Sequence, residues 1–167
     1  MTAQELLDST EDFASLLVDA VDGGASVGFL APLDPATAAA WWTALAPAVE
    51  SGGVLLWAAR VDGRIAGTVQ ISLDGKENGR HRGELVKLLV HREARRRGLG
   101  RELLAAAERG AVDAAVDLLV LDTQTGSAAE GLYRSADWNP VGTVPGFAAD
   151  PAGVRQSTTI FYKNVAS

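Results

Sequence analysis

A run of arginines and glycines in the middle of the chain has the composition of an anion-binding loop. The run reads Arg95-Arg96-Arg97-Gly98-Leu99-Gly100-Arg101. It follows a predicted strand and precedes a predicted helix, so the free N–H groups of the first helical turn can face an anion. Glycine lets a ligand approach the backbone closely, and the guanidinium groups add hydrogen-bond donors. The segment therefore predicts a site for a pyrophosphate group.

Other phosphate-binding loops fit this segment less well. A Walker loop needs Gly-Lys-Ser/Thr, which the sequence lacks, and a dinucleotide-binding loop needs glycine at Leu103 and an earlier place in the fold. The remaining alternative is a basic turn on a solvated surface. The strand before the run and the helix after it favour the anion site.

The elements that would position this loop can be predicted from apolar periodicity and turn residues. Helices are expected at 11–21, 34–50, 99–115 and 127–135, with Pro47 kinking or ending the second. Strands are expected at 3–7, 54–61, 65–73, 84–90, 118–121, 138–144 and 158–163. Asp62-Gly63 predicts a tight hairpin, and 145–155 is expected to be a loop.

The order of these elements predicts the fold class. Strand 84–90, helix 99–115 and strand 118–121 form a unit that requires a right-handed crossover and a parallel strand pair. The other strands follow one another as in antiparallel sheets. We therefore expect an α/β protein with a mixed sheet, folded as a single domain over residues 1–167.

Composition excludes several classes of protein. The chain has 167 residues, no cysteine and two histidines, which excludes disulfides and cysteine nucleophiles and makes a metal site improbable. No apolar run is long enough to span a membrane, and no basic, apolar leader begins the chain. The sequence predicts a cytoplasmic protein without a metal or a membrane partner. The oligomeric state is open, a homodimer included.

The net charge of −6 conceals a strong asymmetry. Residues 1–59 contain eight acids and no lysine or arginine, whereas residues 80–101 hold eight of the fifteen basic residues. A basic patch in an acidic protein suits a small anionic ligand better than a nucleic acid, which the remaining surface would repel. We therefore expect no nucleic-acid partner.

The spacing Arg95-x-x-Gly98-x-Gly100, after the strand 84–90 and before Asp122 and Tyr133, resembles the GCN5-related N-acetyltransferase (GNAT) family. The resemblance extends from about residue 13 to residue 162. Within the family, the stretches 23–29 and 121–127 are most similar to the tabtoxin-resistance acetyltransferase. The resemblance implies the GNAT fold, a mostly antiparallel sheet whose one parallel pair splays apart to hold acetyl-CoA.

The resemblance also implies roles for individual residues. Pantetheine would pair with the backbone of Leu88, Leu89 and Val90, and the pyrophosphate would lie on the N–H groups of 96–101. Glu84 and Asp122 would take a proton from the acceptor amine, and Tyr133 would protonate the departing thiolate. The N–H of Leu89 or Val90 would meet the thioester oxygen.

Three positions depart from the family pattern. Arg92 stands where proline is common, Asp137 where glycine usually precedes an aromatic residue, and Ser127 where asparagine often contacts the cofactor. A serine reaches less far than an amide, and Ser127 is also a good residue to begin a helix. The sequence leaves both roles of Ser127 open.

The acceptor is expected to be a small amine. The acid-only residues 1–59 favour a cationic acceptor, and the subgroup resemblance suggests an amino-acid-like toxin or antibiotic contacted by Ser26, Phe29, Glu84 and Asp122. Two alternatives are open. One is a non-catalytic acyl-CoA sensor or interaction module on the same fold, and the other, less favoured, is a nucleic-acid binder.

Overall fold

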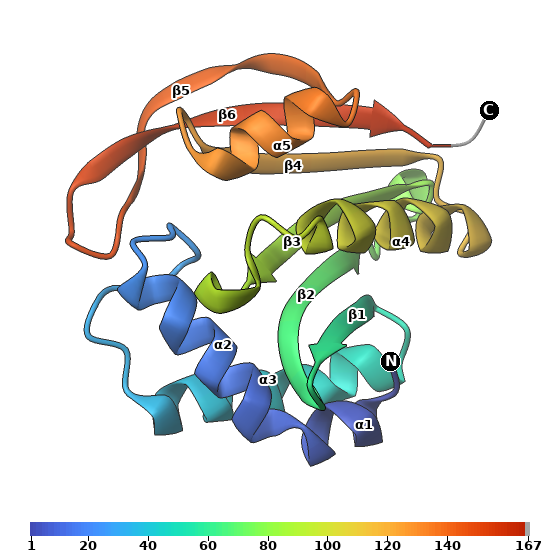
Figure 1. Cartoon of the computed structure of the whole chain (residues 1–167). Coiled ribbons are helices and arrows are strands. Elements are labelled where there is room, and N and C mark those ends of the chain that lie inside the picture. Colours follow the sequence, from blue (N-terminus) through green and yellow to red (C-terminus); the bar gives the residue numbers. More distant parts are fainter. Residues whose placement is uncertain (166–167) are drawn as a thin grey trace.

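A six-stranded sheet divides the protein in the computed structural model, which describes residues 1–165 (Figure 1). The strands are β1 (Val54–Val61), β2 (Arg64–Leu73), β3 (Arg82–Val90), β4 (Leu118–Gln124), β5 (Asn139–Ala149) and β6 (Arg155–Asn164). The helices are α1 (Ala3–Asp8), α2 (Thr10–Asp22), α3 (Pro35–Glu50), α4 (Leu99–Asp113) and α5 (Ala128–Ser135). Short 3₁₀ turns lie at Glu77–Gly79 and Arg92–Ala94.

The sheet is mixed, as the sequence predicts. Its order is β1-β2-β3-β4-β6-β5, and every neighbouring pair is antiparallel except the central pair β3 and β4. That parallel pair is joined only over 82–84 and 118–120. Beyond these residues the two strands diverge, so a V-shaped opening lies in the middle of the sheet.

A β-bulge changes the direction of side chains along β3. Val86 faces Gln70 and Leu89 faces Thr68, so β3 has one more residue than β2 in this interval. Lys87 lies in the bulge with a φ of 53°. Because of the extra residue, Leu85 packs with α4 while Leu89 packs with the core of α1, α2 and α3.

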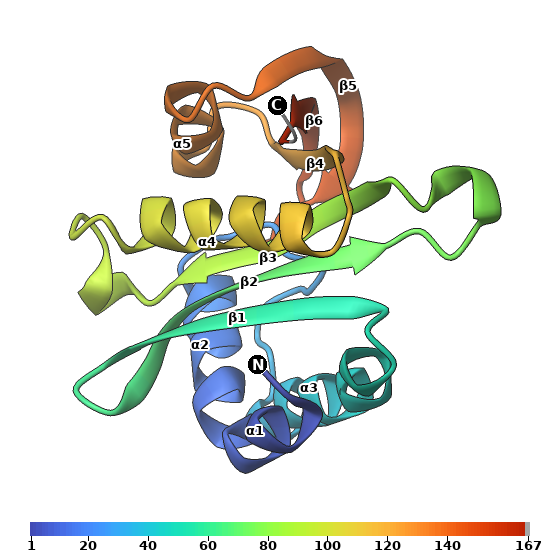
Figure 2. The same cartoon turned by 90° about the vertical axis from the view of Figure 1, so that its right-hand side faces the viewer.

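Helices cover the two faces of the sheet. Figure 2 shows α4 on one face of β1, β2 and β3, and α1, α2 and α3 on the other. The apolar stripe of α4 forms one core with residues of β2, β3, β4 and β6, and this core includes the ring of Tyr133. Trp42 and Phe13 lie at the centre of the other core, with ring centroids 4.5 Å apart. The sheet therefore separates two packed cores.

The structure corrects the first predicted element. Residues 3–7 form helix α1 instead of a strand, because Thr2 and Glu5 form a reciprocal capping box at its start. The apolar residues Ala3 and Leu6 then share one buried face.

Three further boundaries differ from the prediction. Strand β4 continues past the expected end at 121 to Gln124, so Asp122 lies within it. Pro47 does not end α3, which continues to Glu50. The expected loop 145–155 is mostly strand, because β5 runs to Ala149 and β6 begins at Arg155. The turn between them contains only residues 150–154, and Asp150 accepts hydrogen bonds from the backbone of Ala152 and Val154.

The long β5–β6 hairpin crosses the wide end of the opening and meets the α2–α3 loop (Figure 1). Ser26 Oγ donates to the carbonyl of Ala149 at 3.3 Å, and the amide of Ala31 donates to the carbonyl of Pro151 at 2.9 Å. The opening is thus bounded at its narrow end by β3–β4 pairing and at its wide end by this hairpin contact.

Candidate active site

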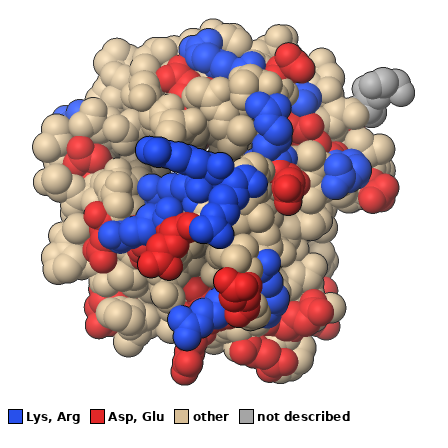
Figure 3. Space-filling view, in the orientation of Figure 1, with Lys and Arg blue, Asp and Glu red and all other residues tan. Residues whose placement is uncertain are grey.

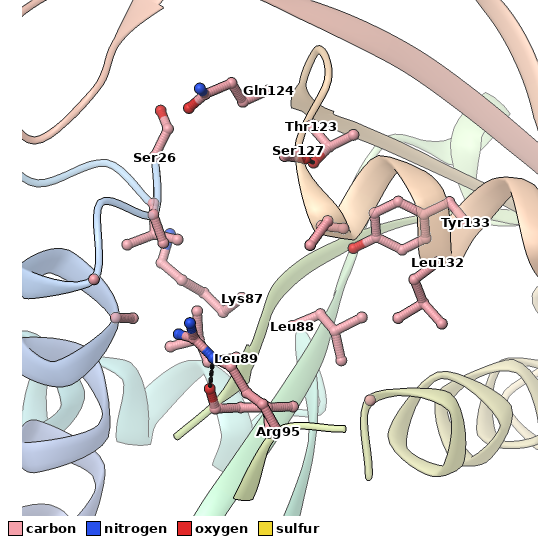
Figure 4. Close-up of a pocket in the computed structure, with 18 of the residues that line it drawn as sticks. Ser26, Lys87, Leu88, Leu89, Arg95, Thr123, Gln124, Ser127, Leu132 and Tyr133 are labelled. Carbon is pink, nitrogen blue, oxygen red and sulfur yellow. Dashed lines mark hydrogen bonds between the residues drawn. The ribbon is translucent and has the colours of Figure 1, made fainter. Parts of the chain in front are cut away.

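A pocket of about 900 Å³ fills the opening between β3 and β4 (Figure 4). Its walls come from the α2–α3 loop, the end of β3, the start of α4, the end of β4, and α5. Pockets of this volume hold small ligands and cofactors.

The start of α4 presents unpaired backbone donors to this pocket. The amides of 96–100 donate to no protein acceptor among residues 1–165, whereas the next two amides both donate to the carbonyl of Gly98. Gly98 precedes the helix with a φ of 85°, a conformation that favours glycine. Consecutive free amides at a helix N-terminus are a built site for a phosphate group.

Only some of the arginines near the free amides of 96–100 line the pocket. Lys and Arg side chains gather on this face over the β3–α4 connection (Figure 3). Arg95, Arg96 and Arg101 line the pocket, but Arg97 is not among the lining residues. Arg101 donates to the Ser135 hydroxyl at 2.8 Å, so its guanidinium also ties α4 to α5.

Arg92, which departs from the family pattern, has a structural partner. Its amide donates to the Asp19 carboxylate at 2.9 Å, and its guanidinium pairs with the same group. Asp19 is 8% exposed on α2, so this ion pair attaches the β3–α4 connection to the helical layer. Proline could not supply that amide hydrogen bond.

The end of β3 offers a free strand edge to the pocket. Leu88, Leu89 and Val90 all line it, and beyond the vertex β3 has no pairing with β4 in the described part of the chain. Arg95 Nε donates to the Val90 carbonyl at 3.0 Å (Figure 4). The Val90 carbonyl therefore faces the pocket side, and its N–H faces the same way, because both groups of a strand residue point to one side.

The two predicted carboxylates are placed differently. Asp122 lies on β4 just past the point of divergence and lines the pocket, where it accepts a hydrogen bond from Thr158 Oγ1 at 3.0 Å. Glu84 lies at the vertex and lines a separate, smaller hollow with Asp74 and Arg82. The structure thus brings Asp122, and not Glu84, into the pocket.

Tyr133 projects from α5 with its hydroxyl toward the cavity (Figure 4). The residue is 5% exposed, and its ring packs against Trp138 and Phe161 at centroid distances of 5.7 and 6.1 Å. Burial, and secondarily the charge of Asp122, raises the pKa of the Tyr133 phenol well above its usual range. The group is therefore a neutral donor at physiological pH.

The serines and Phe29 complete the set of predicted contacts. Ser127 caps α5 by accepting from the Glu130 amide at 3.2 Å, and it lines the pocket as well. Ser26 also lines the pocket. Phe29 does not, because its ring packs edge-on against Trp41 at 5.9 Å.

The acids of residues 1–59 do not form a wall of the pocket. Among the lining residues that the structure describes, Asp122 is the one acid. The N-terminal acids are used elsewhere, Asp34 to cap α3 and Asp19 to pair with Arg92. The pocket lining therefore gives no support for a cationic acceptor attracted by the acids of residues 1–59.

Sequence reasoning missed four polar residues of the pocket, which are Lys87, Thr123, Gln124 and Thr158. Lys87 is half-buried and lines the cavity. The sequence feature that distinguishes Lys87 is that it is the single charged residue in the otherwise apolar run 85–90. No cluster of three or more metal-ligating side chains occurs within residues 1–165, nor any helix long and apolar enough to cross a bilayer.

The chain is similar to known acetyltransferases in sequence and in fold. The sequence model of the acetyltransferase (GNAT) family matches residues 30–138, well over half of the chain. A putative acetyltransferase from Salmonella typhimurium, solved with its cofactor acetyl-CoA, superposes with a TM-score of 0.79 at 18% identity, covering 96% of this chain and 91% of that one. A ribosomal-protein-alanine N-acetyltransferase from Brucella melitensis gives 0.77 at 23% identity, covering 98% and 96%.

A third similar structure is described as a putative phosphinothricin N-acetyltransferase. Its TM-score is 0.78 at 17% identity, and the match covers 96% of this chain and 94% of that chain. At these identities the likeness establishes the shared fold.

Proposed function

This chain belongs to the acetyltransferase (GNAT) family, and we propose that it acetylates a primary amine of a small, amino-acid-like molecule. The protein is an N-acetyltransferase that uses acetyl-CoA. The observation that carries the site assignment is the row of free amides at 96–100, which opens onto the same pocket as Asp122 and Tyr133. The amides fit a pyrophosphate group, and the two side chains fit the proton transfers of acyl transfer.

Asp122 is the principal base in this proposal. An alkylamine with a pKa near ~10 is almost fully protonated at neutral pH, so the acceptor must lose a proton before it attacks the thioester carbon. Asp122 faces the pocket and is held by Thr158, and it takes this proton directly or through a water molecule. Glu84 lies outside the pocket at the vertex and acts through its charge and not by contact.

Two donors stabilise the charges that develop as the nitrogen–carbon bond forms and the carbon–sulfur bond breaks. The Val90 N–H, at the free edge of β3, suits the thioester oxygen better than the Leu89 N–H. The His91 amide donates to the Ala66 carbonyl of β2, so the amides of alternate residues, Leu89 included, face β2. Tyr133 donates a hydrogen bond to the departing sulfur. Because burial raises the pKa of Tyr133, its phenol stays protonated until the thiolate forms, and we assign it the protonation of the departing sulfur expected from the sequence.

The small size of the acceptor follows from the space available. A pocket of about 900 Å³ must hold the pantetheine arm and the acceptor together. Two observations support an amino-acid-like acceptor, including a toxin or antibiotic of that type. One is the resemblance of 23–29 and 121–127 to the tabtoxin-resistance acetyltransferase, and the other is the similar fold of a putative phosphinothricin N-acetyltransferase.

Thiol release from acetyl-CoA across a panel of amino acids and alkylamines tests this proposal. We expect release with at least one small amine, and Asp122→Asn should lower kcat by roughly 10²-fold while acetyl-CoA binding measured by calorimetry is retained. Asp113→Asn, at the exposed end of α4 and outside the pocket lining, is the matched control. Binding of acetyl-CoA without thiol release for any amine would favour the acyl-CoA sensor instead.

A further inference from the structure

Lys87 is a cation inside the pocket for which the protein supplies no ionic partner. It lies in the β3 bulge, is half-buried, and lines the cavity. Within residues 1–165 its ammonium group forms no ion pair and no hydrogen bond with another side chain, and its Nζ lies 5.1 Å from the centroid of the Trp41 ring. The indole stabilises the charge from one side and leaves the N–H donors free toward the cavity.

Several other basic residues have carboxylate partners. Arg92 pairs with Asp19, Arg134 with Glu130, and Lys163 with Glu108. Burial lowers the pKa of Lys87, while the charges of Asp122 and Glu84 act in the opposite direction. A desolvated cation in a left-handed backbone conformation is costly for the fold, and an apolar residue on this strand would avoid the desolvation cost.

The ammonium group of Lys87 lies apart from the free amides of 96–100, where the pyrophosphate is proposed to bind. A Cβ placed on Gly28 would lie 3.9 Å from Nζ, so the ammonium group adjoins the α2–α3 loop across the pocket from α5. Figure 4 shows the Lys87 side chain extending toward this loop, with Ser26 and Gln124 on the same side and Tyr133 on the other. Asp122 lines the same cavity. On this side the pocket therefore offers a small molecule the cation of Lys87 and the carboxylate of Asp122.

We propose that Lys87 binds a carboxylate of the acceptor, so that the substrates are amines that also carry a carboxylate group. This inference rests on the proposed function and specifies the substrate class of the same site. Asp122 attracts the ammonium end of such a molecule and Lys87 its carboxylate end, and the two contacts fix which nitrogen faces the thioester. The Gln124 amide, on the same side of the pocket as Lys87, supplies a neutral hydrogen-bond donor to the same carboxylate.

The test compares amino acids with their carboxamides, which lack only the negative charge. A hydrogen bond to a charged group predicts that the wild-type protein prefers the acid by about tenfold or more in kcat/KM, and in Kd measured by calorimetry with CoA present. Lys87→Met keeps the packing against Trp41 and should remove most of this preference, whereas Lys87→Arg should retain part of it. Lys76→Met, in the exposed loop before β3, is the matched control.

The outcomes separate this inference from the proposed function. Thiol release with equal preference for acids and amides, or a preference that survives Lys87→Met, would overturn the role of Lys87 and leave the acetyltransferase assignment intact. Tighter binding of acids that requires Lys87, without thiol release, would support the carboxylate site and contradict the proposed turnover. If no acid binds better than its amide, the inference is wrong. Mass spectrometry after incubation with acetyl-CoA alone checks Lys87 itself, because its acetylation would make it the acceptor and not the anchor.

Discussion

The contribution of the Tyr133 ring to packing can be measured separately from the contribution of its hydroxyl to catalysis. Its ring is packed in the core and its hydroxyl faces the pocket, where it has no hydrogen-bond partner within the described chain. Tyr133→Phe should therefore leave Tm nearly unchanged and lower kcat by roughly tenfold or more, because a hydrogen bond to a developing charge is lost. Thermal melting and single-turnover rates measure the two effects. Wild-type turnover in this variant, under conditions where chemistry limits the rate, would show that Tyr133 is structural.

The sequence predicts which segments form the site better than it predicts which side chains point into the pocket. The loop 95–101 is recognisable because it follows a strand and begins a helix, and Asp122 because it is the first acid after the apolar run 118–121. Arg97 was assigned to the site as part of the loop motif, and Phe29 and Glu84 through the family resemblance, but each lies outside the pocket lining. The direction of a side chain on β3 depends on the bulge, which requires knowledge of the β2 register.

The loop that begins α4 depends on the backbone conformation of one glycine. Gly98→Val places a branched side chain at a φ of 85° and in front of the free amides, so it should abolish the rise in Tm produced by acetyl-CoA. Gly52→Val is the control, since its φ is 73° with open space around it and it lies outside the pocket lining. Both variants should lose some stability, roughly 1–2 kcal/mol. A full acetyl-CoA response in Gly98→Val would show that the phosphates bind elsewhere.

The packing of α4 on β1 is tested by a second pair of glycines. A Cβ on Gly110 would lie 2.1 Å from the Trp57 ring, whereas Gly131 in α5 has nothing within 4 Å. Gly110→Ala should lower the free energy of unfolding by about 1–3 kcal/mol through overpacking, and Gly131→Ala should raise it by about 0.4–1 kcal/mol. Urea titration measures both changes. An equal response of the two variants would contradict this account of the contact between α4 and β1.

The elements that could be predicted are those whose own sequence decides their structure. The Asp62-Gly63 turn has φ angles of 50° and 83°, and the amphipathic faces of α2 and α4 fix these helices. The wrong element, 3–7, is too short for periodicity, and its helix depends on the Thr2 capping box. β5 is exposed along its whole length and exists by pairing with β6, a contact that the composition of 145–149 does not reveal.

The stability of the whole molecule should depend on carboxylates that anchor turns. Hydrogen bonds from the Thr2 and Lys76 backbones lower the pKa values of Glu5 and Asp74, and the Gly126 amide does the same for Glu130. Because these pKa values are lowered on folding, their stabilisation is present above the unfolded values of 4.5 and 3.8 and is lost as the pH falls further. We expect a nearly constant Tm between pH 7 and 5 and a steep fall below about 4.5.

A single variant checks the origin of this acid sensitivity. Glu130→Gln should lower Tm at pH 7, because the ion pair with Arg134 is lost, and should flatten the decline at acidic pH. Glu77→Gln, exposed in the loop before β3, is the control. An unchanged acid profile in Glu130→Gln would assign the effect to other groups.

The two ends of the opening are joined with very different strength. At the narrow end, parallel backbone pairing over 82–84 and 118–120 joins the halves of the sheet as a hinge. At the wide end, the α2–α3 loop meets the β5–β6 hairpin through a hydroxyl bond of 3.3 Å from Ser26 and a backbone bond of 2.9 Å from Ala31, which together act as a catch. Widening the cleft at the catch costs these two bonds, whereas widening it at the hinge would break the sheet. Tolerance for acceptors of different sizes therefore belongs to the catch, while the hinge keeps Asp122, just past the paired residues of β4, in a fixed position.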